Sequence, residues 1–482
     1  MTDPPSSPTS SSTTASAAYR DDDLPGQTRF AGIFATSRND HFCYVHGIGW
    51  HKWSGRHWQY NKKGEAQRSL VKMLHSMHSQ AFGNQSRVQE ISRMTSHGAQ
   101  QGILAIASVL PEMAVGADEI DTDPYLLNCM NGTLDLRTTE LRPHDPGDRL
   151  TKVTRAAFDS DYLTDIAGTA PTWIKFLEEV LPDPAVRSYL QRYIGLSLLG
   201  MVREHQLAIA TGIGANGKST FTNAILYAFG SYGHEAEQDL FMKAKASPNS
   251  ASPAILNLMG RRFVVTQETE VGAPLATALM KTLTGGDSIT ARGLYQPVPI
   301  TFTPSHTALM VTNHLPKVPA NDDALWRRLV VIPFDVVIPP AERNSHLGEE
   351  LQLEADGILA WAVQGYLDYI HQGLNPSGQI QVATATYRSN SDVVTQFIND
   401  ACVIDANARV TRKDLWPAWQ QWAAASGVPH GQQRMLYDRL VHLGYTEYKT
   451  SKDRGFTGLR LDTDIDIQDV LEEPTESNDT KE

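Results

Sequence analysis

The sequence predicts an α/β protein of several domains, and three observations support that prediction. Residues 201–335 alternate short apolar strands with helical stretches, the pattern of a sheet covered by helices. The glycine-rich stretch GIGANGKS, at 212–219, lies between an apolar strand, QLAIA, and a helical stretch, TFTNAILYAFG. The chain has 482 residues, enough for two to four domains, and 41% of them are hydrophobic and can fill their cores.

Composition restricts the class of protein. No apolar run approaches 18 residues, and the N-terminus lacks a basic segment followed by an apolar one, so we expect neither a membrane span nor a secretory signal. The three cysteines, Cys43, Cys129 and Cys402, lie far apart, which favours a reducing compartment over a disulfide framework. The sequence therefore predicts a cytoplasmic protein.

The net charge of −12 belongs mainly to the two ends of the chain. Residues 1–24 are rich in Ser, Thr and Pro and carry −3, and residues 462–482 carry −8; we expect both to be disordered tails. The acidic end is expected to aid solubility, with competition against DNA as the alternative. The body between them carries about −1, so the overall acidity does not argue against a nucleic-acid partner.

Residues 25–200 predict a mixed block of helices and strands. GWHKWSGRHW, at 49–58, predicts a strand and a turn with Gly55 at the bend, and its tryptophans are expected in a core. Helices are expected at about 65–80 and 84–110, and short strands within 124–152 with turns at Asn131-Gly132 and Pro146-Gly147. A helical stretch at 172–200 leads into the alternating block.

The stretch from Gly212 to Ser219 follows the pattern G-x-x-x-x-G-K-S. Its glycines let backbone N–H groups approach phosphates, and the following helix adds partial positive charge at its N-terminus. Lys218 is expected to bridge the β- and γ-phosphates, and the Ser219 hydroxyl to bind Mg²⁺, so ATP and Mg²⁺ are the expected ligands. The nucleotide-binding residues are expected to be Gly212, Gly214, Asn216, Gly217, Lys218, Ser219 and Thr220.

Catalytic residues are expected at the ends of neighbouring strands. RRFVVTQETE, at 261–270, ends in Glu268 and Glu270; Glu268 is favoured to hold Mg²⁺ and orient the attacking water, but their division of labour stays open. TALMVTN ends in Asn313, where an amide could contact the γ-phosphate. ALWRRLVVIPF places Arg327 and Arg328 before a strand, and a guanidinium, also one from a neighbouring subunit, can stabilise the transferring phosphoryl group. We expect these groups to gather where the ligands of α/β sheets bind.

The order Lys218, Glu268, Asn313, Arg328 resembles that of the superfamily 3 helicases, and most closely the phage, plasmid and poxvirus primase-helicase family. The matching stretches between residues 30 and 461 are GIGANGKST, LTGGDSITARGLYQ, FTPSHTALMVTNHLP, NDDALWRRLVVIPF, NGTLDLRTTELRPHDPGDRLTK and ATATYRSNSDVVTQFI. The resemblance implies Lys218 and Ser219 on phosphate and Mg²⁺, Glu268 for hydrolysis and Asn313 as a sensor. Arg328 becomes the arginine that acts on the adjacent subunit, with Arg327 as the second candidate.

The resemblance also implies a domain order. We expect an N-terminal helicase-associated α+β domain at 25–200, an AAA+ P-loop ATPase core at 201–335 and a helical connector at 336–390. A winged-helix domain is expected at 391–461, between the connector and the acidic tail.

Two regions are expected to bind DNA. Residues 283–304 predict a hairpin with its tip near 293–296, and the equivalent hairpin of superfamily 3 rings projects into the channel; an ordinary surface hairpin is the alternative. There Arg292 would meet phosphate and Tyr295 could stack on a base, with Lys281 on the preceding helix as a further contact. Residues 410–461 predict two helices and a hairpin, with Thr411 as N-cap and Gly427 as stop, a pattern that binds duplex DNA or proteins. The expected contacts there are Arg434, Arg439, Lys449, Lys452 and Arg454.

The sequence therefore predicts an ATP-dependent, ring-forming DNA helicase, expected as a hexamer on single-stranded or forked DNA. It would serve phage, prophage or plasmid replication in the cytoplasm of a bacterial host. No paired-carboxylate primase site is apparent, so we expect no primer synthesis from this chain and a separate primase as partner. The alternatives are an initiator that uses ATP as an assembly switch without unwinding DNA, and a small-molecule kinase, in which Arg328 and the hairpin would have no role.

Overall fold

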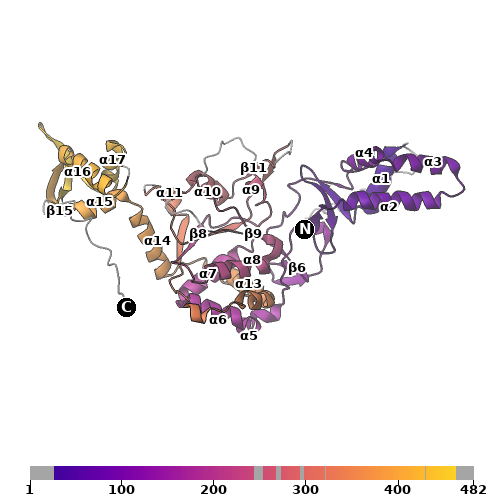
Figure 1. Cartoon of the computed structure of the whole chain (residues 1–482), viewed down its shortest axis with the longest axis horizontal. Helices are drawn as coiled ribbons and strands as arrows, with labels where there is room; N and C mark the ends of the chain where they lie inside the picture. Colours follow the sequence, from indigo (N-terminus) through magenta and orange to yellow (C-terminus); the bar gives the residue numbers. More distant parts are fainter. Residues whose placement is uncertain are drawn as a thin grey trace, which may run out of the picture.

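The computed structural model describes residues 26–243, 253–267, 273–293, 298–320, 322–428 and 430–462. Both predicted tails lie outside these ranges, except for residue 462. Three modules follow one another along the long axis of the molecule (Figure 1): an N-terminal module at 26–115, a central module, and a C-terminal module at 391–462. Among the described helices, none combines the length and the apolar content needed to cross a membrane.

The central module is built on a five-stranded sheet in the order β14-β8-β13-β10-β9, and every neighbouring pair in it is parallel. Leu207, the first residue of β8, is in register with Ala308 on one side and Leu329 on the other. The predicted α/β class is therefore confirmed. The strands are β8 (Leu207–Thr211), β9 (Gly233–Glu235), β10 (Phe263–Gln267), β13 (Thr307–Thr312) and β14 (Leu329–Pro333).

Helices cover both faces of this sheet, because successive side chains of each strand enter two different apolar cores. Figure 1 shows α7, α8 and α13 on one side and α9, α10 and α11 on the other. The first side consists of α6 (Pro171–Val180), α7 (Pro184–Leu196), α8 (Lys218–Phe229), α12 (Leu347–Leu353) and α13 (Ala355–Gln372). The second consists of α9 (Pro253–Leu256), α10 (Thr277–Leu283), α11 (Asp323–Trp326) and the antiparallel pair β11 (Ile289–Ala291) and β12 (Ile300–Phe302).

The packing does not follow the predicted domain boundaries. Leu127 and Trp173 share one apolar core with α8, so the chain from about 124 to 200 belongs to the central module and not to the N-terminal one. Within the predicted connector, α13 crosses α7 so closely that a Cβ on Gly195 would lie 2.1 Å from the amide nitrogen of Tyr366. Periodicity shows that a helix has a buried face but not which element covers it, so these partners could not be assigned from the sequence.

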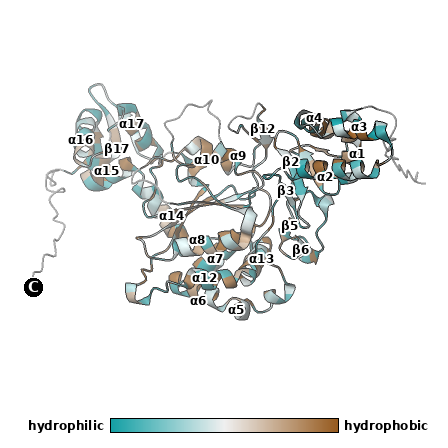
Figure 2. Cartoon of the chain, turned by 45° about the vertical axis from the view of Figure 1, so that its right-hand side comes forward, coloured by the Kyte–Doolittle hydropathy of each residue, from teal (hydrophilic) through white to brown (hydrophobic). Residues whose placement is uncertain are grey.

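The N-terminal module combines a small sheet with a helical extension, which Figure 2 shows at one end of the molecule. The strand and turn predicted at 49–58 are present, with Gly55 at φ 89° between β2 and β3. Trp58 is buried and packs against Trp53, with ring centroids 5.6 Å apart. The elements are α1 (Gln27–Arg38), β1 (Phe42–Val45), β2 (Gly49–Trp53), β3 (Trp58–Tyr60), α2 (Glu65–Gln80), α3 (Gln85–Met94), α4 (His97–Ala107) and β4 (Ala114–Val115).

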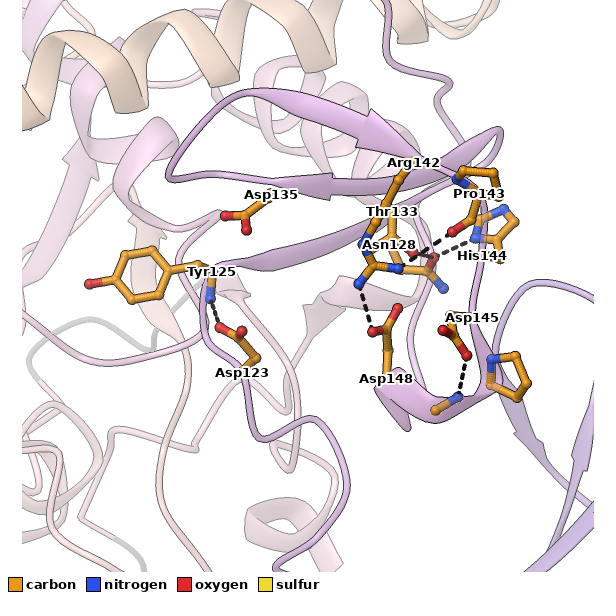
Figure 3. A network of polar contacts seen from close by, with 12 residues as sticks. Asp123, Tyr125, Asn128, Thr133, Asp135, Arg142, Pro143, His144, Asp145 and Asp148 are labelled. Atoms are coloured by element: carbon orange, nitrogen blue, oxygen red, sulfur yellow. Dashed lines mark hydrogen bonds and ion pairs between the residues drawn. The ribbon is translucent and has the colours of Figure 1, made fainter. Parts of the chain in front are cut away.

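A buried amide fastens the N-terminal module to the central one. Asn128 lies in the antiparallel sheet of β5 (Leu126–Cys129), β6 (Gly132–Asp135) and β7 (Glu140–Arg142). Its Nδ2 donates to the carbonyl oxygens of Arg56 (2.8 Å) and Lys152 (3.0 Å). Its Oδ1 accepts from Thr133 (3.2 Å) and from Nδ1 of His144 (2.7 Å), as Figure 3 shows. Every polar atom of this side chain has a partner, and the bond to Arg56 links the N-terminal module to the central one.

The C-terminal module follows α14 (Gly378–Asn390), which packs against β14 of the central sheet. Its strands form an antiparallel sheet in the order β15-β17-β16. Thr411 accepts from the amide of Asp414 (3.1 Å) and Gly427 has φ 64°, in agreement with the predicted helix cap and stop. The elements are α15 (Val393–Ala401), β15 (Cys402–Thr411), α16 (Arg412–Ala425), α17 (Gln433–His442), β16 (Thr446–Lys449) and β17 (Arg454–Leu461).

Candidate functional site

The glycine loop connects the carboxyl end of β8 to the start of α8. Its backbone takes positive φ at Gly214 (106°), Ala215 (51°) and Gly217 (80°). A Cβ on Gly212 would lie 2.2 Å from the carbonyl oxygen of Phe334, so this position accepts only glycine. Successive turns of this kind expose backbone N–H groups on a concave surface that suits an anion.

The first turn of α8 adds to that surface. No side chain caps the helix at Gly217, and the amide of Phe221 is the one that bonds back to the Gly217 carbonyl oxygen (2.9 Å). The N–H groups ahead of Phe221 lie at the positive end of the helix dipole. Ser219 is exposed and Thr220 half-buried in this turn, so both hydroxyls lie beside the loop. The uncapped start of this twelve-residue helix leaves N–H groups that can donate to an anion such as phosphate.

Lys218 occupies the centre of the loop and is only 5% exposed. Its ammonium donates to the Gly212 carbonyl oxygen (2.9 Å), to Oδ1 of Asn216 (2.9 Å) and to Oδ1 of Asn313 (3.1 Å). Burial lowers the pKa of Lys218. All three acceptors are neutral, so among the described residues the buried positive charge has hydrogen bonds but no counter-charge, and an anionic ligand would supply one.

Asn313 reaches the loop because β13 and β8 are neighbours in the sheet. Thr312, the last residue of β13, is in register with Thr211, the last residue of β8. Both strands therefore end at the same side of the sheet, and Asn313, directly after β13, meets Lys218, which is 95 positions away in the sequence. The Thr312 hydroxyl accepts from the amide of His314 (3.1 Å), which holds the turn around Asn313.

Glu268 and Glu270 lie outside the described residues. The strand before them ends at Gln267, which is in register with Val311 of β13.

Arg327 and Arg328 lie at the amino ends of the parallel strands, opposite the ends that hold the glycine loop. They precede β14, and the carbonyl oxygen of Arg328 accepts from the amide of Leu207 (2.7 Å), the first residue of β8. Since β8 and β14 are parallel, a strand length separates the arginines from the glycine loop. Arg327 is exposed; Arg328 is half-buried, and its Nη1 is buried without an acceptor among the described atoms. One chain therefore does not bring them to Lys218, and the expectation that all catalytic groups gather at one edge is not met.

Two of the predicted DNA contacts are instead bound to carboxylates of their own chain. Lys281 pairs with Asp322 at 2.6 Å, and Asp322 also caps α11. The hydrogen bond from Lys281 lowers the pKa of Asp322. Arg439 pairs with Asp392 at 2.7 Å; Asp392 is buried and Arg439 is half-buried. These two cations therefore join elements of the fold, and each has a counter-charge within its own chain.

Five of the other predicted DNA contacts are exposed. Arg292 directly follows β11, and Tyr295 lies outside the described residues. Arg434, on α17, is 87% exposed and makes an ion pair at 3.3 Å with Asp438 one turn away. The hairpin tip between β16 and β17 presents Lys449, Lys452 and Arg454.

Sequence reasoning missed how the glycine loop is held from the side. Nδ2 of Asn216 donates to the Phe334 carbonyl oxygen (2.8 Å), and the amide of Ile338 donates to the Ala215 carbonyl oxygen (2.9 Å). The segment after β14 therefore supports the loop that follows β8. Backbone carbonyls carry no residue signature, so the sequence holds no signal for this support.

A large groove lies between the central and C-terminal modules. It has a volume of about 1390 Å³, and Thr211, just before the glycine loop, lies on its wall. Side chains of α14, including Val382 and Tyr387, line it, and so do Arg439 and Asp392 of the C-terminal module. This ion pair thus lies where the two modules face each other.

Comparisons with known proteins agree with the sequence motifs. The family described as "D5 N terminal like" matches residues 29–182. A "Putative helicase" of Acanthamoeba polyphaga mimivirus is 29% identical over 327 residues, covering 63% of this chain and 33% of that protein. A "Putative helicase" of Frog virus 3 is 25% identical over 298 residues, 58% of this chain and 30% of that protein. A "Putative primase" of African swine fever virus is 22% identical over 364 residues, 70% of this chain and 37% of that protein.

The chain spans about a third of the length of these curated relatives. A solved structure described as "The A form apo structure of NrS-1 C terminal region-CTR" has a TM-score of 0.47 and 10% identity, covering 90% of this chain and 100% of that one. The domain match and the viral relatives confirm the resemblance predicted from the motifs: the chain is similar to proteins of the primase-helicase family.

Proposed function

We propose that this chain is an ATP-driven DNA helicase of the superfamily 3 type that works as a ring. The observation that carries the proposal is the contact of the Lys218 ammonium with Asn313, which joins the glycine loop to a polar group from the neighbouring strand. Phosphate oxygens that replace the neutral acceptors of Lys218 would give its charge a partner. Asn313 would then be free to orient the attacking water.

Different residues of the site would bind the phosphates, bind Mg²⁺ and accept the proton of the attacking water. The uncapped first turn of α8 and the turns at Gly214 and Gly217 would bind the phosphates through N–H groups. The exposed Ser219 hydroxyl, together with Glu268, would hold Mg²⁺, which supplies positive charge to the β- and γ-phosphates. Glu268, with Glu270 as the second candidate, would take the proton from the attacking water.

The placement of Arg327 and Arg328 supports an active site shared between subunits. From the amino end of β14 a guanidinium cannot reach the glycine loop of its own chain. It can meet the glycine loop of a second copy that packs against this side of the sheet. Repeating such a heterologous contact closes a ring, for which we propose a hexamer. The exposed Arg292 at the end of β11 would then contact DNA from the hairpin of each copy.

The C-terminal module supports contact with DNA by its order of elements. A helix, a strand, two helices and a two-stranded wing follow one another, as in winged-helix domains. Three exposed cations, Lys449, Lys452 and Arg454, lie at or beside the wing tip, where they can meet the phosphates of a duplex. We propose this wing as the part of the ring that meets the duplex of a fork.

Subunit mixing tests the proposal. Lys218→Ala and Arg328→Ala proteins are each expected to lose ATP hydrolysis, because each breaks all sites of its own ring. Mixed rings contain some sites with an intact loop facing an intact arginine, so mixing should restore part of the activity. Lys175→Ala, at a 78% exposed lysine of α6, serves as the control and should behave as the unaltered protein. Normal hydrolysis by Arg328→Ala alone would refute the shared site.

Arg292→Ala separates the motor from the switch. If the hairpin moves DNA, this variant should hydrolyse ATP at the basal rate but no longer displace a strand from a forked substrate. If the unaltered protein hydrolyses ATP and binds DNA but never displaces a strand, the chain is an initiator that uses ATP as an assembly switch, and the motor is refuted.

A further inference from the structure

The charge of the described chain is divided between its modules. Residues 26–115 contain ten Lys and Arg residues and four Asp and Glu residues, a formal charge of +6. Residues 116–461 carry −7 by the same count. The positive charge therefore collects in the N-terminal module, at the opposite end of the molecule from the wing (Figure 1).

Four of these ten Lys and Arg residues lie on helix α2 or directly before it. Ala66, Leu70 and Met73 are buried and turn the opposite face to the core of the module. Arg68, Lys72 and His75 are exposed and follow one another at helical spacing on the solvent side. Lys62 and Lys63, also exposed, directly precede the helix. These five residues form a basic stripe along α2.

Three lysines of the stripe have no counter-charge. Lys62, Lys63 and Lys72 make no ion pair with any described carboxylate, whereas Arg68 is 3.5 Å from Glu65. By contrast, Lys281 and Arg439 of the other two modules are neutralised by Asp322 and Asp392. Neighbouring cations without counter-charges repel one another, and a polyanion that binds them would relieve this repulsion.

An exposed aromatic ring stands at the end of the stripe. Phe82 lies two residues after Gln80, the last residue of α2, and is 97% exposed, in a turn that Gly83 (φ 94°) completes. A phenylalanine that makes so little contact with its own protein can stack on an unpaired base. With 16 residues, α2 is about 24 Å long, a length that matches about seven phosphates of one strand of a duplex.

We propose that the basic stripe of α2, together with Phe82, is a second nucleic-acid site that binds the phosphate backbone of DNA. It is separate from the hairpin and from the wing. The stripe reads no base edges, so it binds without regard to sequence. Phe82 favours single strands over duplex, because only unpaired bases expose their faces to it.

Salt dependence of DNA binding by the full chain, measured without nucleotide, tests the site. Lys62→Gln/Lys63→Gln/Lys72→Gln removes three phosphate contacts, so the plot of log affinity against log salt should become shallower. The expected change is about 2.1 on single-stranded DNA and about 2.7 on duplex. Phe82→Ser should weaken single-strand binding by about 5- to 100-fold and leave the salt slope and duplex binding unchanged.

A matched pair of variants excludes an effect of net charge alone. Lys72→Glu and Lys175→Glu each reverse one exposed lysine on a helix, and only the first lies in the stripe. We expect Lys72→Glu to weaken binding and Lys175→Glu to leave it within twofold of the unaltered protein. Equal effects of the two, or an unchanged salt slope in the triple variant, would overturn the site. Because the assay contains no ATP, its result is independent of the proposed motor.

Discussion

Replacing Arg439 by Met should destabilise the C-terminal module rather than weaken its grip on DNA. The substitution keeps an unbranched apolar stem but removes the guanidinium that donates to Asp392 at 2.7 and 3.1 Å. Asp392 is 4% exposed and is left with the Thr395 hydroxyl and the amide of Val394. A buried carboxylate without its cation costs about 3 kcal/mol. For a module of this size that corresponds to a fall in Tm of about 12 to 24 °C.

The same pair predicts how stability depends on pH. Burial acts to raise the pKa of Asp392, but the hydrogen bonds from Arg439 and Thr395 and the charge of Arg439 outweigh it, so the pKa lies below its usual value. A carboxyl group with a depressed folded pKa contributes stability that is fully present above the unfolded value of about 3.9. This contribution is lost as the pH falls through the lower folded value. Below about pH 4 the unaltered protein should lose the advantage that it holds over Arg439→Met at neutral pH.

Two measurements on the same samples decide between a structural and a DNA-binding arginine. Thermal unfolding followed by circular dichroism should show the loss in Tm, and DNA binding at a temperature where the variant is folded should keep its salt slope. Arg434→Met, at an exposed arginine of the same helix, is the control and should change stability by less than about 0.5 kcal/mol. An unchanged Tm with a salt slope shallower by about one would refute the structural role of Arg439.

Three further substitutions follow from close contacts. Gly212→Ala should abolish ATP binding measured by calorimetry, because its Cβ would lie 2.2 Å from the Phe334 carbonyl oxygen and displace the loop, while the far-ultraviolet dichroism stays that of the folded protein. Lys281→Met should lower the free energy of unfolding, measured with urea, by about 1 kcal/mol, because its ion pair with Asp322 is partly exposed. It should leave the salt slope of DNA binding unchanged; a shallower slope would show that Lys281 contacts phosphate. Gly195→Ala should lower the stability of the central module by about 1 to 3 kcal/mol, as is typical of overpacking, because α13 leaves no room for a methyl group. The thermal midpoint should fall accordingly, and an unchanged midpoint would contradict the close crossing.

The features predicted most accurately from the sequence are those in which a short motif carries both the chemistry and the local structure. A glycine loop between a strand and a helix has one common function, so the α/β class and the place of Lys218 followed from short patterns. The neighbourhood of Asn313 was also predictable, because parallel strands deliver their carboxyl ends to one edge of a sheet. Arg327 and Arg328 are the exception in the same motif series: they precede their strand, and the direction of a parallel strand then carries them to the other edge.

Surface charges were the least predictable part. Lys281 and Arg439 looked like DNA contacts because a sequence shows a cation without the carboxylate that tertiary structure brings to it from 41 or 47 positions away. The stripe on α2 was missed for the opposite reason. Its residues are spread over a helix and a turn, and their common face becomes visible only when the buried side of the helix is known. Counting charges by module is the signal that could have found it.

The strand β14 connects two features that the sequence treats separately. It begins directly after Arg328, and the residue that follows it, Phe334, holds the glycine loop through Asn216. Five strand residues, buried and paired along their whole length with β8, cannot shift at one end without moving the other. In a ring whose arginines face the next subunit, a change at one nucleotide would thus be transmitted along β14 to the loop of the adjacent site. The support of the loop by a backbone carbonyl is therefore part of how neighbouring sites could sense each other.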